Sequence, residues 1–127
     1  MKFLLLIHSA EDAWPPDEHA VALEESIQLC HQLHVKHEYL GAAPLQPAET
    51  ATCVKVRNGQ PIVSDGPYVE TKEQLGGYFL IDVKDREAAI AIAAQIPGSR
   101  RGTTEIRPVV EVTNLPHMIP YNIQDQQ

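Results

Sequence analysis

The segment over residues 65–83 constrains the fold of this 127-residue chain most, because a rigid turn leads through a polar loop directly into a strand. Asp65-Gly66-Pro67 is typical of a turn, since the carboxylate can accept local backbone N–H bonds, glycine tolerates any φ and proline fixes φ. Gly76-Gly77 allows a close turn into residues 78–83, which are a strand by composition. A polar loop held in this way favours a small-molecule pocket.

The N-terminal half of the chain alternates strand and helix patterns. Residues 2–8 predict a strand, and their continuous apolar run indicates burial on both faces. A helix is predicted from Pro15-Pro16 to about His34, because apolar residues recur every three or four positions. Residues 37–45 predict a second strand. Asn58-Gly59, between residues 52–57 and 60–64, predicts a β-hairpin because both turn residues must take positive φ. The apolar stripe of the helix consists of Ala20, Leu23, Ile27, Cys30 and Leu33.

The C-terminal half completes a βαββαβ order with an inserted hairpin. Asp85 is expected to cap a second helix, which Pro97-Gly98 ends, and residues 103–112 predict the last strand. This order predicts an α+β, ferredoxin-like fold, in which both helices cover one face of an antiparallel sheet. Residues 1–112 would form one domain. Residues 113–127 would be a tail, extended or packed on a partner subunit. The expected buried side of the second helix is Ala88, Ala89, Ile92, Ala93 and Ile96.

Apolar side chains on both faces of the sheet predict a homodimer. Two helices can cover only one face, so the other is expected to close against a second copy, sheet against sheet, as a dimeric α+β barrel.

The composition argues against several classes of partner. The net charge is −7, from ten Lys and Arg against 17 Asp and Glu, which disfavours nucleic-acid binding. The apolar run over residues 3–7 is too short for a membrane span or a signal-peptide core. Cys30 and Cys53 lack metal or redox spacing. We therefore expect a cytoplasmic protein with reduced cysteines.

Three blocks of the chain resemble the YCII-related family, in its DGPF-type branch: residues 65–83, residues 41–45 with 50–52, and residues 105–109. The resemblance covers residues 2 to about 112 and implies a ferredoxin-like, dimeric protein related to muconolactone-isomerase-like barrels. Some of those barrels bind or transform small, often aromatic or chlorinated, acids. Most members of the branch have no assigned reaction, and many are encoded beside extracytoplasmic-function sigma factors.

The chain departs from the family pattern at two positions. Tyr68 replaces the usual Phe of the motif, and His8 stands where many relatives have Tyr. The His–Asp pair proposed for better-studied relatives has no secure counterpart in this chain.

Three residues are candidates for proton transfer. Asp65 could act as a general base or orient a histidine, or it could only lock its turn. His8 is expected to look into the barrel, where an imidazole could exchange protons near neutral pH, or it could be a hydrogen-bonded core histidine. His19 lies in the first turn of the predicted helix, near where relatives place their histidine. It could be a neutral base, although surface exposure is the simpler account.

Four residues are candidates for substrate binding: Tyr68, Glu70, Lys72 and Tyr78. Lys72 could attract a carboxylate while Glu70 or Glu73 accepts a proton, although such a loop is usually solvated surface and could instead clasp a partner subunit. Tyr68 and Tyr78 could form an aromatic wall for a small planar ligand, or Tyr78 could pack in the core.

Neither a metal nor a cofactor is expected. Cys30 and His31 each lie about one helical turn before His34, a workable metal spacing, but no carboxylate is spaced to complete a site. The sequence has no Gly-rich phosphate loop, nucleophile elbow or nucleotide fingerprint.

The sequence therefore leaves two functions open. The first is binding of a small organic acid, aromatic acids included, in a pocket between helices and sheet close to the dimer interface, with cofactor-free isomerisation or loss of HCl as the reaction. The second is a non-catalytic accessory or sensor module that acts through a regulatory protein partner, linked to sigma-factor regulation.

Overall fold

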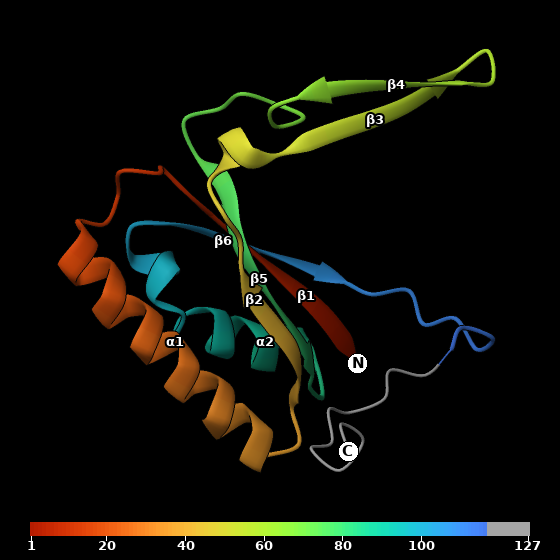
Figure 1. Cartoon of the computed structure of the whole chain (residues 1–127). Coiled ribbons are helices and arrows are strands. Elements are labelled where there is room, and N and C mark those ends of the chain that lie inside the picture. Colours follow the sequence, from red (N-terminus) through yellow and green to blue (C-terminus); the bar gives the residue numbers. More distant parts are fainter. Residues whose placement is uncertain (117–127) are drawn as a thin grey trace, which may run out of the picture.

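The computed structural model describes residues 1–116 and has the predicted α+β, ferredoxin-like architecture (Figure 1). A four-stranded antiparallel sheet has the order β2-β5-β1-β6, and both helices lie on one of its faces. The hairpin β3-β4 forms a separate two-stranded sheet. The strands are β1 (Lys2–Ser9), β2 (Tyr39–Pro44), β3 (Thr52–Arg57), β4 (Gln60–Asp65), β5 (Gln74–Asp82) and β6 (Gly102–Pro108). The helices are α1 (Pro16–Val35) and α2 (Arg86–Ala93), with short 3-10 helices η1 (Ala48–Thr50) and η2 (Pro97–Arg100).

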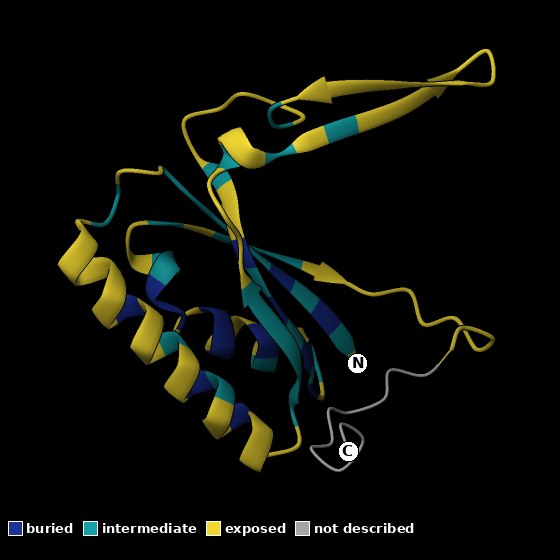
Figure 2. Cartoon of the chain, viewed as in Figure 1, coloured by how far each residue is buried: buried dark blue, intermediate teal, exposed yellow. Residues whose placement is uncertain are grey.

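The hydrophobic core lies between the helices and one face of the sheet (Figure 2). Phe3 and Leu5 of β1 lie two positions apart, so both side chains point toward the helices, and both are almost completely buried. They pack with β5 and with both helices, and burying each large apolar side chain contributes about 1.5–3 kcal/mol. The remaining members of the buried cluster are Leu29, Leu33, Phe79, Ile81, Val83, Ala89, Ile92, Ala93 and Ile96.

The opposite face of the sheet is bare within one copy of the chain. Pairing of β1 with β5 sets Leu4 opposite Leu80 and Leu6 opposite Tyr78, on the face that neither helix covers. These side chains are only partly buried. Within one copy the first strand is therefore buried on one face only, and burial of its second face, which was predicted to pack on a second copy, stays a prediction.

Helix α1 turns a different face to the core than the sequence predicted. Its buried residues are Ala22, Leu29 and Leu33. Leu23 and Ile27, members of the predicted stripe, are partly exposed instead. The apolar arc of α1 is wide, and packing against α2 selects one edge of it.

Local turn and cap predictions are confirmed. Asn58 and Gly59 take φ of 52° and 74°, as the two-residue hairpin turn requires. The Asp85 side chain accepts a hydrogen bond from the Ala88 backbone N–H at 2.9 Å and caps α2. No side-chain hydrogen bond forms at Asp65 among residues 1–116, so the turn there does not depend on its carboxylate.

Three predicted boundaries are wrong. His37 does not begin a strand: it has φ of 59° and closes α1, while the Glu38 N–H donates to the Leu33 carbonyl at 2.9 Å. Strand β5 begins at Gln74, so Gly76-Gly77 lies inside it rather than before it. Strand β6 ends at Pro108. The predicted tail falls mostly on residues 117–127, outside the described residues.

Candidate functional site

An open cleft of about 800 Å³ lies between α1 and the part of the sheet formed by β2 and β5. Its walls are mostly apolar, which is typical of small-molecule sites. From α1 come Leu23 and Ile27, two exposed members of the predicted stripe, and Cys30, which also packs against the core. Polar side chains that border it are Ser9, Glu11, His19, Ser26, His31, His34, Gln46 and Gln74.

Small residues on the strands leave the space for this cleft. Ala42 and Ala43 of β2 and Gly76-Gly77 of β5 line the wall opposite α1. At Gly77 a side chain would meet the Ala43 carbonyl oxygen at 3.1 Å, so a larger residue would push β2 away from β5. Because these strand residues are small, side chains do not fill the space between α1 and this part of the sheet.

The loop from β1 to α1 is tied down at one end of the cleft. The Ala48 backbone N–H donates to Glu11 Oε1 at 2.8 Å, which joins this loop to η1. Trp14 carries the Arg101 guanidinium 4.1 Å above its ring centroid. Arg101 also donates to Glu18 at 2.7 Å and to the Ala13 carbonyl at 3.0 Å. His19 borders the cleft at this end.

The other end of the cleft holds two groups that stay protonated. Burial raises the pKa of the Cys30 thiol. Burial, with smaller contributions from Cys30 and Tyr78, also raises the pKa of the Tyr39 phenol. His34 stands edge-on to Tyr39 with ring centroids 6.4 Å apart. His19 and His34 are fifteen residues apart on one helix, so the cleft runs for about 22 Å along α1.

The charge of the lining is low. Glu11 is the one carboxylate among the lining residues, and the lining contains neither Lys nor Arg. Histidine imidazoles are therefore the basic groups that a ligand in this cleft would meet. His19, His31 and His34 lie along the same side of α1.

Two of the predicted site residues border the cleft. His19 reaches it from α1. Tyr78 lines it through its position in β5, while strand alternation places the Tyr78 side chain on the opposite face of the sheet, beside Leu6. The catalytic and binding roles predicted for them stay predictions.

His8 lies on the opposite face of the sheet. Its Nε2 is 3.3 Å from Glu105 Oε1, and Arg107 donates to the same carboxylate at 3.0 Å. Arg107, and to a lesser degree His8, lower the pKa of Glu105. The structure therefore joins His8 to Glu105 and not to Asp65 or Tyr78.

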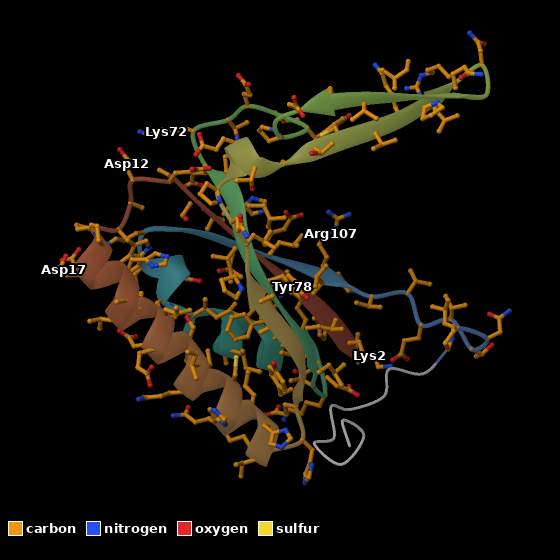
Figure 3. All side chains as sticks on the ribbon, in the orientation of Figure 1. Lys2, Asp12, Asp17, Lys72, Tyr78 and Arg107 are labelled. Carbon is orange, nitrogen blue, oxygen red and sulfur yellow. The ribbon has the colours of Figure 1, made fainter. Side chains whose placement is uncertain are left out.

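The remaining predicted residues lie outside the cleft. Asp65 ends β4, and Tyr68, Glu70 and Lys72 belong to the loop between β4 and β5. Tyr68 is 93% exposed. Lys72 extends from this loop into solvent near the base of the hairpin (Figure 3). Within one copy, the loop is not a wall of the cleft.

Sequence reasoning missed several residues that shape the cleft. Trp14, Glu11 and Tyr39 lie in or beside loops, where no periodicity points to a shared site. The spacing in the sequence pointed to His34 only as a candidate metal ligand. Among residues 1–116, no group of three or more His, Cys, Asp or Glu side chains is placed to hold a metal ion. The described helices include none with the length and hydropathy needed to cross a membrane.

Comparison with known proteins identifies the family. The model of the YCII-related domain matches residues 1–113. The chain belongs to the YCII-related family. It is also 32% identical over 104 residues to an uncharacterized protein of Rhizobium meliloti (strain 1021), a match that covers 80% of this chain and 83% of that protein. The family resemblance predicted from the sequence is thus confirmed.

Proposed function

We propose that this YCII-related protein is a cytoplasmic homodimer that binds a small organic acid, aromatic acids included, in the cleft between α1 and the sheet. The cleft carries the proposal, because about 800 Å³ of mostly apolar space with a few polar groups suits one small molecule. Free cysteines support the cytoplasmic location. The bare sheet face, with Leu4 and Leu80, supports the homodimer.

The ligand is proposed to bind at the end of the cleft near the start of α1. There the Trp14 indole provides an aromatic surface, and the contact with Arg101 fixes its orientation. His19 is the basic side chain at this end and can donate a hydrogen bond to a carboxylate. Within one copy, no role in binding is proposed for Asp65, Tyr68, Glu70 or Lys72, because these residues do not border the cleft.

Proton transfer is proposed as the chemistry of this site, without a cofactor. An imidazole is the side chain best suited to exchange a proton near neutral pH. Glu11 is less suited to this task, since its carboxylate already accepts the Ala48 N–H. A substrate bound against Trp14 could lose a carbon-bound proton to His19 and regain one at another carbon, which is an isomerisation.

Thermal shift and calorimetry with benzoate, 4-chlorobenzoate and the neutral benzamide test binding. We expect the two acids to raise Tm and benzamide to have a smaller effect, because benzamide lacks the carboxylate. His19→Asn should weaken binding of the acids about tenfold or more, the cost of one charge-assisted hydrogen bond. His37→Asn is the matched control, since His37 lies outside the cleft and Asn tolerates its positive φ.

Equal weakening by both histidine variants would contradict the assignment of the ligand to this end of the cleft. No stabilisation by any of the acids would contradict the binding proposal itself. Capture of a protein partner together with that result would favour an accessory module. Proton transfer is tested separately by NMR in D₂O with phenylpyruvate, an aromatic acid whose C–H bonds beside the ketone can exchange. Exchange faster than in buffer alone that His19→Asn abolishes supports proton transfer, and exchange at the buffer rate contradicts it.

A further inference from the structure

The β3-β4 hairpin has no packing partner within its own chain. Both strands pair only with each other. Every hairpin residue in these strands is exposed except Cys53, which is partly buried near the hairpin base. Figure 2 shows the hairpin as an exposed projection from the body. An isolated two-stranded hairpin is marginally stable in water, so a projection of this length indicates a contact outside the chain.

Most of the exposed apolar side chains of the hairpin lie on one of its faces, whereas the other face is mostly polar. The register sets Val54 opposite Val63 and Val56 opposite Pro61 on the first face. Val54, Val56 and Val63 are 64%, 59% and 63% exposed. The first face also carries the polar pair Thr52 and Asp65 at the hairpin base. Alternation along the strands puts the other positions on the second face, which bears Cys53, Lys55, Arg57, Gln60, Ile62 and Ser64. In a hairpin surrounded by solvent, grouping apolar side chains on one face adds no stability. In a hairpin docked on a partner, that face buries the valines.

The hairpin extends on the side of the sheet that the helices leave bare. In Figure 1, α1 and α2 lie on one side of the four-stranded sheet, and the hairpin reaches out on the other. The bare face carries Leu4, Leu6 and Leu80. A second copy packed on this face would therefore lie beside the hairpin, and two-fold symmetry would place the partner's hairpin against the first copy.

Charge favours a second copy of this chain as the occupant. The hairpin, residues 52–65, carries two basic side chains and one acidic, whereas the rest of the chain carries eight basic and sixteen acidic. A weakly basic hairpin is attracted to a strongly acidic body, and each copy supplies both. A stable interface buries about 800 Å² per partner, more than four small apolar side chains supply, so the hairpin must act together with the bare sheet face.

We propose that the β3-β4 hairpin is an arm that clasps the second copy of a homodimer, with Val54, Val56, Pro61 and Val63 packed against the partner. The inference rests on the homodimer of the proposed function and adds which element holds it together. By this arrangement each copy exchanges an arm with the other around one two-fold axis.

Sedimentation equilibrium of the full chain tests the arm. Val54→Lys with Val63→Lys places two charges on the apolar face and should raise the dimer Kd at least about 100-fold, since buried unpaired charges are costly. Ile62→Lys is the matched control: it adds a charge to the other face of the same hairpin, at a side chain that is 44% exposed, and should change Kd less than about threefold.

Hydrogen exchange of the wild-type chain is a second test, and it does not depend on whether a variant folds correctly. Amides of β3 and β4 should exchange at least about tenfold more slowly above the dimer Kd than below it. The arm would be overturned, while the dimer stands, if the double variant left Kd unchanged or if Ile62→Lys raised Kd as much as the double variant does. Exchange of the β3 and β4 amides at a rate independent of concentration would overturn it as well. A monomeric wild-type chain would overturn the dimer and the arm together.

Discussion

At the scale of single residues, Cys30 shows how position on a helix decides chemistry. It borders the cleft through α1, and the pKa of its thiol is raised by burial. Its neighbour in the cleft, Tyr39, has a raised pKa for the same reason. Both groups are therefore neutral hydrogen-bonding side chains at neutral pH, and neither is a nucleophile there.

Alkylation of Cys30 should be slow and should require high pH. In a Cys53→Ser chain, we expect iodoacetamide at pH 8 to modify Cys30 about tenfold more slowly than free cysteine, because less of the thiol is thiolate. The rate should rise with a midpoint above that of free cysteine. Mass spectrometry measures the rate, and the chain unfolded in guanidinium is the control. A rate equal to that of the unfolded chain would contradict the buried position.

At the scale of elements, close approach of β1 and β6 depends on one glycine. A Cβ at Gly102 would strike the His8 carbonyl oxygen and lie 2.9 Å from Ser9 Cβ. The His8 carbonyl belongs to the backbone of β1, which cannot move away without separating the two strands. The pairing of β1 with β6 also brings His8 and Glu105 together, so this glycine supports a contact that the sequence does not reveal.

Gly102→Ala should destabilise the chain by about 2 kcal/mol or more, since overpacking between paired strands forces the backbone to shift. A thermal melt should show a fall in Tm of about 5–10 °C. Gly41→Ala is the control, because nothing lies within 4 Å of a Cβ there. If the two variants melted at the same temperature, β1 and β6 would not approach as closely as described.

At the scale of the whole molecule, the sheet has one covered face and one bare face. Leu4 and Leu80 pair across the bare face, and the hairpin projects on the same side. The candidate cleft lies on the covered side, between α1 and the sheet. A dimer built on the bare face would thus leave the cleft open to ligands, so the proposed binding and the proposed assembly would use opposite sides of one sheet.

Leu4→Glu should convert the dimer to a monomer at micromolar concentration. An uncompensated carboxylate inside a sheet interface costs several kcal/mol, so Kd should rise at least about 100-fold. Sedimentation should show twice the 14.1-kDa chain mass for the wild type and the single mass for the variant. Val21→Glu, an exposed change on α1 outside the cleft, should leave the dimer intact. A monomeric wild type would contradict the homodimer.

Local features of this protein were determined by sequence alone. The Asn58-Gly59 turn and the Asp85 cap each depend on the conformational preferences and hydrogen bonds of a few adjacent residues. The order of helices and strands follows from apolar periodicity, so the ferredoxin-like fold was predictable as well. Family membership was predictable because whole blocks of residues carry it.

Tertiary structure alone decided which face each residue presents. Leu23 and Ile27 were expected in the core, but the packing of α1 turned them toward the cleft. His8 met Glu105 because β1 pairs with β6, a contact across 97 positions of the chain. The physical reason is that turns and caps are set by neighbours in sequence, whereas a site is set by strand register and helix orientation, which minimise the free energy of the whole chain at once.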